Sequence, residues 1–101
     1  NSKVVALQGY IHAMAGRTGA ARETLVELAA LRTQRFVPPY AEALIWLGLG
    51  DLEQAARFLE RCIEAHDVHL IFLLADAKWD PVRALPWFDD FFSRCGFTLQ
   101  G

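Results

Sequence analysis

The fold of this chain is decided by the stretch Tyr40-Ala41-Glu42-Ala43-Leu44-Ile45-Trp46-Leu47-Gly48-Leu49-Gly50-Asp51. Apolar residues occupy nearly every position up to Leu49, so a helix built from them has to be covered on more than one side. Gly50 suits the left-handed end of that helix. Asp51, with Gln54 three residues later, forms a capping box that starts another helix. The stretch therefore predicts a buried helix joined by a tight turn to a second helix.

The helical period extends along the whole sequence, and no segment alternates in the manner of a strand. We expect helices at about 4–15, 20–32, 39–49, from Asp51 onward, at 68–75 and from Pro86 to a cap at Gly96, with a turn at Trp79-Asp80-Pro81. The first and third are apolar almost all round, whereas the second and fourth carry one apolar stripe. Stacked helical hairpins produce this alternation, because each inner helix is enclosed by its neighbours.

An internal repeat appears when the sequence is compared with itself at a spacing of 34 residues. The matching pairs are Gly16 with Gly50, Ile11 with Ile45, Ala21 with Ala55, Leu25 with Leu59, Gly9 with Ala43, and Leu28 with Cys62. The two glycines fall where a helix ends. The smaller residues fall where the two helices of a hairpin have to approach closely.

This repeat resembles the tetratricopeptide repeat family. The resemblance covers 2–35 and 36–69, and a decayed unit at 70–96 resembles a terminal cap, so 1–101 forms one domain. His12 departs from the pattern, because the family usually has a large apolar residue there, and no proline closes the first repeat. The resemblance implies an all-α fold, an α–α solenoid of two helical hairpins plus a C-terminal capping helix pair. It also implies a protein-binding scaffold with no chemistry of its own.

The end of the chain resembles the C-terminal segment of bacterial multidomain regulators, in which such repeats follow a DNA-binding, cyclase or kinase domain. The resemblance is carried by 38–62, the Asp80-Pro81 turn and a short aromatic helix ending in Gly96. Because the chain begins without Met and enters a helix almost at once, we interpret it as a piece of a longer, cytoplasmic protein. Targeting signals would then lie upstream.

Composition excludes several classes of function. With 101 residues, 53% apolar and 22% charged, the chain can fold around one core. Its net charge of −2 and scattered cations argue against direct nucleic-acid binding. No segment approaches the ~20 apolar residues of a membrane span. The two cysteines, Cys62 and Cys95, form no disulfide framework and fit apolar helix stripes instead.

A partner-binding groove is implied by the family, whose concave surface is lined by the first helix of each hairpin. The corresponding residues here are Lys3, Ala6, Tyr10, Ala13 and Met14, followed by Val37, Tyr40, Leu44 and Leu47. An apolar, aromatic groove with one cation suits an apolar peptide or helix. Alternatively, the chain's own C-terminal helices or upstream repeats cover these residues.

Neither a metal site nor a catalytic motif stands out. Cys62, His66 and His69 have a spacing that can ligate a metal, but structural zinc usually needs four ligands and Cys62 belongs to an apolar stripe. The adjacent carboxylates Asp89 and Asp90 do not face each other on a helix. We expect the aromatic set Trp79, Trp87, Phe88, Phe91 and Phe92 to plug the end of the array. We therefore expect no enzyme activity and no cofactor.

The predicted function is protein–protein interaction, as the interaction or sensory segment of a bacterial regulator such as a transcriptional regulator. Two alternatives remain open: a small-ligand-sensing helical domain, with its pocket between the third helix and the terminal aromatic helices, and an accessory domain of an upstream cyclase or kinase. The first helix also carries too many apolar residues for one partner helix to hide. We therefore predict a homodimer through the N-terminal hairpin.

Overall fold

The computed structural model describes residues 2–74 and 76–95, and within this part of the chain it contains helices and no strand. Four longer helices come first and four short ones follow. Their bounds are α1 Ser2–Met14, α2 Thr18–Arg32, α3 Pro39–Gly48, α4 Leu52–Glu64, η1 Val68–Leu74, η2 Ala77–Trp79, α5 Asp80–Arg83 and α6 Phe88–Arg94, with η marking 3₁₀-helices. The all-α prediction is confirmed. No helix in the described residues is long and apolar enough to cross a bilayer.

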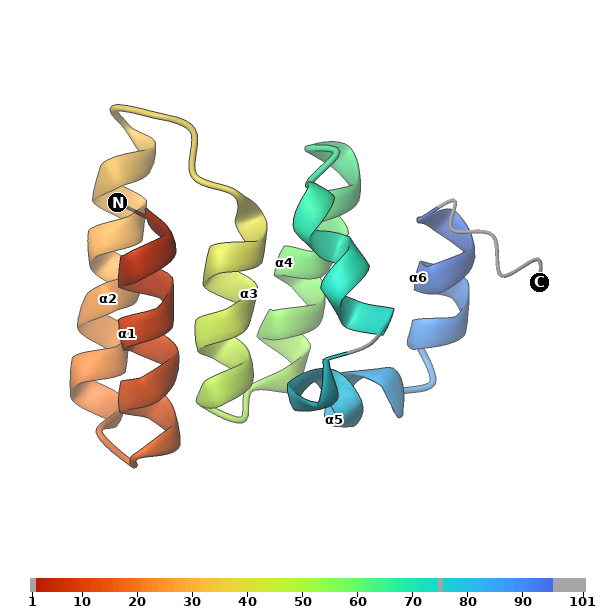
Figure 1. The fold of residues 1–101 in the computed structure, drawn as a ribbon, viewed down its shortest axis with the longest axis horizontal. Coiled ribbons are helices and arrows are strands. Elements are labelled where there is room, and N and C mark those ends of the chain that lie inside the picture. The colour runs from red at the N-terminus through yellow and green to blue at the C-terminus, as the bar shows by residue number, and fades with distance from the viewer. Residues whose placement is uncertain (1, 75, 96–101) are drawn as a thin grey trace.

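The four long helices form two hairpins that lie side by side (Figure 1). Helix α1 packs against α2 and α3, and α3 packs against α1 and α4. The described molecule measures 41 × 30 × 20 Å, with the short C-terminal helices on the far side of the second hairpin. Ala43 and Ile45 of α3 are fully buried, as expected for a helix enclosed between neighbours.

Both predicted helix-ending glycines adopt the left-handed conformation, with φ of +82° at Gly16 and +79° at Gly50. Each helix ends in the same hydrogen-bond pattern: Arg17 N donates to the carbonyl of His12, and Asp51 N donates to that of Trp46. The predicted cap of α4 also forms, since Gln54 N donates to the Asp51 carboxylate at 3.1 Å. These local signals are strong because each satisfies backbone groups that a helix end leaves unpaired.

Small residues lie where helices meet, as the repeat predicted. A Cβ built on Gly9 would lie 2.8 Å from Ile45 Cδ1 and would also clash with Thr24 Oγ1, so α1, α2 and α3 converge there. Ala21 and Ala55 are completely buried in their hairpins. The close spacing of the helices therefore depends on the absence of larger side chains at these positions.

The C-terminal segment differs from the prediction. Residues 68–74 form a 3₁₀-helix, the expected turn at 79–81 is helical, and the last helix begins at Phe88 instead of Pro86. Asp76 caps η2 by accepting from Lys78 N at 3.1 Å, and Pro81 is tolerated because it lies in the first turn of α5. Pro86 lies in a turn closed by Phe88 N donating to Leu85 O. Ala75 and the cap expected at Gly96 lie outside the described residues.

Aromatic side chains fill the C-terminal end of the core. Trp79 and Phe91 are at most 1% exposed and belong to the same buried cluster as Ile45 and Leu59. Trp87 stacks on Phe91 with ring centroids 4.4 Å apart. Its indole Nε1 donates to the Glu60 carboxylate at 2.6 Å and so attaches the segment before α6 to α4.

Candidate functional site

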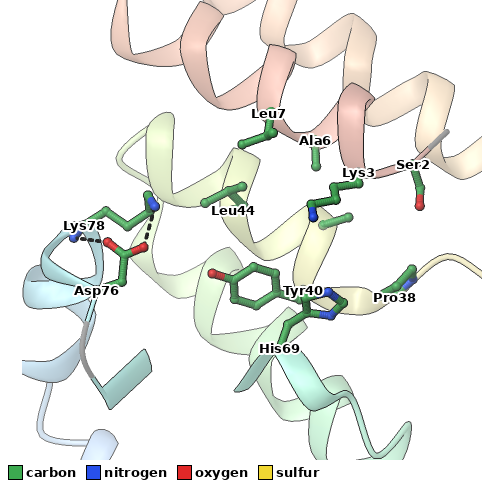
Figure 2. Close-up of a pocket in the computed structure, with 11 residues that line it drawn as sticks. Ser2, Lys3, Ala6, Leu7, Pro38, Tyr40, Leu44, His69, Asp76 and Lys78 are labelled. Carbon is green, nitrogen blue, oxygen red and sulfur yellow. Dashed lines mark hydrogen bonds and ion pairs between the residues drawn. The ribbon is translucent and has the colours of Figure 1, made fainter. Parts of the chain in front are cut away.

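A cavity of about 290 Å³ opens between α1, α3 and the η1–η2 segment, and we call it the groove (Figure 2). It is lined by Ser2, Lys3, Ala6, Leu7, Pro38, Tyr40, Ala41, Leu44, His69, Asp76 and Lys78. Four of these, Lys3, Ala6, Tyr40 and Leu44, are residues that the sequence placed in a partner-binding groove. The first helices of both hairpins thus contribute to one concavity.

The other five predicted groove residues do not line this cavity. Ala13, Val37 and Leu47 are buried, Met14 is 63% exposed, and Tyr10 lies 5.8 Å beneath the Lys78 ammonium. A Cβ on Gly48 would contact both Ala13 and Tyr10, so α1 and α3 touch at this end. The groove is therefore open only along the first half of α1.

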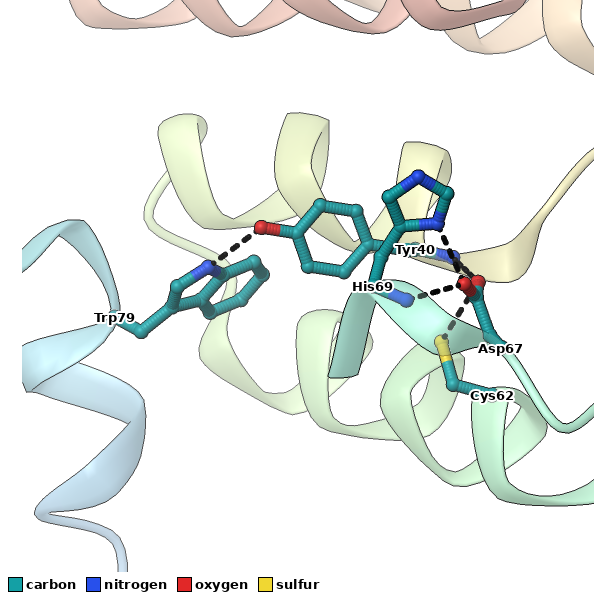
Figure 3. Close-up of polar contacts among 5 residues, drawn as sticks. All are labelled: Tyr40, Cys62, Asp67, His69 and Trp79. Atoms are coloured by element: carbon teal, nitrogen blue, oxygen red, sulfur yellow. Dashed lines mark hydrogen bonds and ion pairs between the residues drawn. The ribbon is translucent and has the colours of Figure 1, made fainter. Parts of the chain in front are cut away.

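Tyr40 forms a wall of the groove and is held on several sides (Figure 3). Its hydroxyl accepts a hydrogen bond from Trp79 Nε1 at 3.0 Å, and its ring stacks on His69 at 5.4 Å with a 17° interplanar angle. Burial raises the pKa of Tyr40 to about 12, so the phenol is neutral at physiological pH. The wall is rigid and aromatic, and it carries no charge.

A buried carboxylate, Asp67, organises the residues behind this wall. One of its oxygens accepts from Tyr40 N at 3.2 Å, and the other accepts from His69 N at 3.0 Å and lies 2.7 Å from His69 Nδ1. The Cys62 thiol points to the same carboxylate at 3.6 Å. Asp67 therefore links the start of α3 to the start of η1 and fixes Tyr40 and His69 relative to each other (Figure 3).

Charged groups lie at the edges of the groove, whereas its floor is apolar. Ala6, Ala41 and Leu44 of the floor are each at most 6% exposed. At one edge the Lys78 ammonium pairs with Asp76 at 2.6 Å, and this hydrogen bond holds the pKa of the Asp76 carboxyl below its ordinary value. Lys3 extends from α1 on the other side, toward Tyr40 (Figure 2). Such a site suits an apolar group whose flanks are polar.

The residues that the sequence suggested as possible metal ligands have structural roles instead. Cys62 is fully buried, and burial raises the pKa of its thiol, so the thiolate that binds metals is disfavoured. His66 adopts a left-handed φ of +53° at the end of α4, and His69 faces Asp67. Within 2–74 and 76–95, no three His, Cys, Asp or Glu side chains are grouped so that they could hold a metal ion.

The sequence did not identify His69, Asp76 and Lys78 as groove residues. They belong to 70–96 or its border, where the 34-residue repeat has decayed and no equivalent position guides the comparison. The sequence contained only a weak indication of the role of Asp67, because an acidic residue that follows one helix can cap the next. Its bond to Tyr40 N spans 27 residues and depends on tertiary packing.

Comparison with protein-family models, with curated proteins and with solved structures gave no match to this chain. The tetratricopeptide resemblance therefore depends on the internal repeat, the two left-handed glycines and the paired hairpins described above.

Proposed function

We propose that this chain is a protein-interaction module of the tetratricopeptide type, and that its groove binds an apolar segment of another protein. The observation that carries the proposal is an open, apolar-floored cavity between the first helices of two successive hairpins. Following the resemblance noted above, the module would serve as the interaction or sensory segment of a bacterial regulator.

The size of the groove and the fixed position of Tyr40 favour a partner that inserts one or two side chains into it over a partner that only covers its surface. About 290 Å³ holds one or two large apolar side chains and lies at the lower end of the volumes typical of small-molecule sites. Tyr40 is fixed by its contacts with Asp67, His69 and Trp79 before any partner arrives. Preorganisation of this kind lowers the entropic cost of binding.

Peptide selection tests the proposal without knowledge of the natural partner. A library of random peptides displayed on phage is selected on the immobilised chain, and enriched peptides are synthesised and titrated by calorimetry. We expect them to share an aromatic or large aliphatic anchor. Ala6→Phe fills the floor of the groove and should weaken their binding at least about tenfold, equivalent to roughly 1.4 kcal/mol.

The matched control is Ala30→Phe, which adds the same ring at an exposed position of α2. It should leave the affinity unchanged, and circular dichroism should show that both variants keep the helical fold. Peptides that bind the two variants equally would show that the groove is not the binding surface.

A second candidate, sensing of a small ligand, is favoured by the polar side chains of His69 and Lys78 that meet the apolar floor. Saturation-transfer NMR with a library of small organic fragments distinguishes the two functions. Fragments that Ala6→Phe displaces, together with a failed peptide selection, would favour ligand sensing.

A further inference from the structure

His69 presents its two ring nitrogens to different surroundings. Nδ1 lies 2.7 Å from the Asp67 carboxylate, whereas Nε2 points away from Asp67, toward the ribbon of α1 (Figure 3). His69 also lines the groove, which opens between α1, α3 and the η1–η2 segment. The ring nitrogen that a group bound in the groove meets is therefore Nε2.

The contact with Asp67 determines where the His69 ring carries its proton. An ionised carboxylate only accepts hydrogen bonds, and Asp67 also accepts from the backbone amides of Tyr40 and His69. The short contact between the carboxylate and the ring therefore requires a proton on Nδ1. In the neutral ring Nε2 then carries a lone pair and accepts a hydrogen bond. The groove thus combines an apolar floor with a directional acceptor.

Two ammonium groups lie at the edges of the same groove. They belong to Lys3 of α1 and to Lys78 of η2 (Figure 2). The Lys78 ammonium pairs with Asp76 and lies 5.8 Å from the centroid of the Tyr10 ring, so it already contacts one aromatic face. Ammonium groups attract the faces of aromatic rings, and tryptophan gives the strongest contact of this kind. The edges of the groove therefore favour an aromatic anchor over an aliphatic one.

We propose that the groove takes the side chain of a tryptophan in the partner protein, and that the indole N–H donates to His69 Nε2. The indole is a large apolar group whose polar atom only donates. Phenylalanine and leucine have no proton to donate to Nε2, and a tyrosine hydroxyl brings lone pairs that need a donor of their own. This inference rests on the proposed function and names the anchor that the partner supplies.

The groove suits an indole that belongs to a protein chain. Its volume of about 290 Å³ opens between helices, so a chain can continue on either side of the anchor. The charged groups of Lys3, Lys78 and Asp76 line its edges, where the polar peptide groups that flank an anchor would lie. Free indole has no flanking groups to contact these edges.

Substitution of the anchor in a selected peptide tests the hydrogen bond. We expect peptides enriched by phage selection to carry tryptophan at the anchor position. The synthetic comparison replaces this tryptophan by benzothienylalanine, which keeps the bicyclic ring and has sulfur in place of the N–H. Calorimetry should show binding weakened by about threefold to tenfold, the effect of losing one neutral hydrogen bond.

Two variants of the chain locate the acceptor. His69→Phe keeps an aromatic ring beside Tyr40 and removes Nε2, so the two peptides should bind this variant equally. Asp76→Asn is the control, because it removes the charge of the other acceptor at the groove and asparagine can still cap η2. It should leave the difference between the peptides unchanged. Each result is a ratio measured on one variant, so a general loss of affinity does not affect it.

The outcomes separate this proposal from the proposed function. Enriched peptides anchored by leucine or phenylalanine, or a benzothienylalanine peptide that binds the unchanged chain as tightly as its tryptophan parent, would overturn the tryptophan anchor and leave groove binding intact. Long-range proton–nitrogen NMR that finds the neutral His69 ring protonated on Nε2 would also overturn it. Binding of free indole without any enriched peptide would assign the groove to a small ligand instead. Failure of the groove itself shows separately, as peptide binding that Ala6→Phe does not weaken.

Discussion

Replacement of Gly9 by alanine tests the packing of α1 in the layer of helices. The added methyl would lie 2.8 Å from both Cδ1 and Cγ1 of Ile45 and would clash with Thr24 Oγ1. None of these neighbours moves freely. Ile45 is fully buried, and the Thr24 hydroxyl is fixed by donating to the Ala21 carbonyl.

Two effects of opposite sign determine the outcome. Alanine in place of glycine within a helix stabilises by about 1 kcal/mol through backbone entropy. Overpacking of a filled core costs about 1–3 kcal/mol. We therefore expect Gly9→Ala to be destabilising by as much as about 2 kcal/mol. If only the backbone entropy mattered, the variant would be more stable than the unchanged protein.

Gly19→Ala is the matched control, because a Cβ at Gly19 in the first turn of α2 meets no atom within 4 Å. It should stabilise the protein by about 0.5 kcal/mol. Urea unfolding followed by circular dichroism measures both changes, and an unchanged slope would show that the unfolded states are comparable. The difference between the two variants should be about 0.5–2.5 kcal/mol.

A double variant identifies the clash. Ile45→Val removes Cδ1 and on its own costs about 0.5–1.5 kcal/mol. In the Gly9→Ala background it should cost less, because it removes one of the three close contacts while Ile45 Cγ1 and Thr24 Oγ1 remain, giving a coupling of at least about 0.5 kcal/mol. The predicted clash is refuted if Gly9→Ala and Gly19→Ala stabilise the protein equally and Ile45→Val has the same effect on stability with and without Gly9→Ala. In that case α1 does not approach α3 at Gly9, and the layered arrangement of the helices is wrong.

Two further predictions concern backbone strain and titration. Gly50→Ala should destabilise the protein by about 1–2 kcal/mol although its Cβ meets no atom, because φ is +79° at this position. His66→Gly should stabilise it by up to about 1 kcal/mol, because glycine relieves the strain of a φ of +53°. Urea unfolding measures both changes, and a stabilising Gly50→Ala or a destabilising His66→Gly would refute the assigned helix ends. In a Tyr10→Phe variant Tyr40 is the only tyrosine, and its ultraviolet absorbance should show ionisation near pH 12. Because the unfolded phenol ionises near pH 10, stability should fall above that pH by up to about 1.4 kcal/mol per pH unit, and a midpoint near 10 would mean that Tyr40 is not buried.

The first two-thirds of the fold could be predicted because its signals are local or repeated. Gly16 and Gly50 had to end helices, since left-handed backbone is strained for other residues. Asp51 and Gln54 had to begin one, since their hydrogen bond satisfies a free backbone amide. The starts of α1 and α2 still differed from the prediction by two residues, because helix ends fray and are the least sharply defined part of a helix.

The C-terminal third was less predictable because its structure depends on contacts made across the fold. The run 68–74 has a composition that suits an α-helix, yet it is a 3₁₀-helix whose first turn is fixed by Asp67. Arg83 donates to the carbonyl of Asp76 at 3.1 Å, bringing α5 back onto the preceding segment. No periodicity in the sequence marks either bond.

The groove is formed partly by helices that the sequence predicted and partly by segments that it did not predict. Its α1 and α3 sides were implied by the tetratricopeptide resemblance, which is why Lys3, Ala6, Tyr40 and Leu44 could be named in advance. Its third side comes from η1 and η2, whose residues have no repeat equivalent. The burial of Ala13 could not be predicted in detail, since it depends on how closely α1 approaches α3.

The C-terminal segment therefore has two roles that follow from one set of contacts. Trp79 is fully buried in the core cluster, and its indole donates to the hydroxyl of Tyr40, a residue that lines the groove. Asp67 likewise caps η1 and also binds Tyr40 N. The short C-terminal helices thus contribute to the core cluster and also shape the groove.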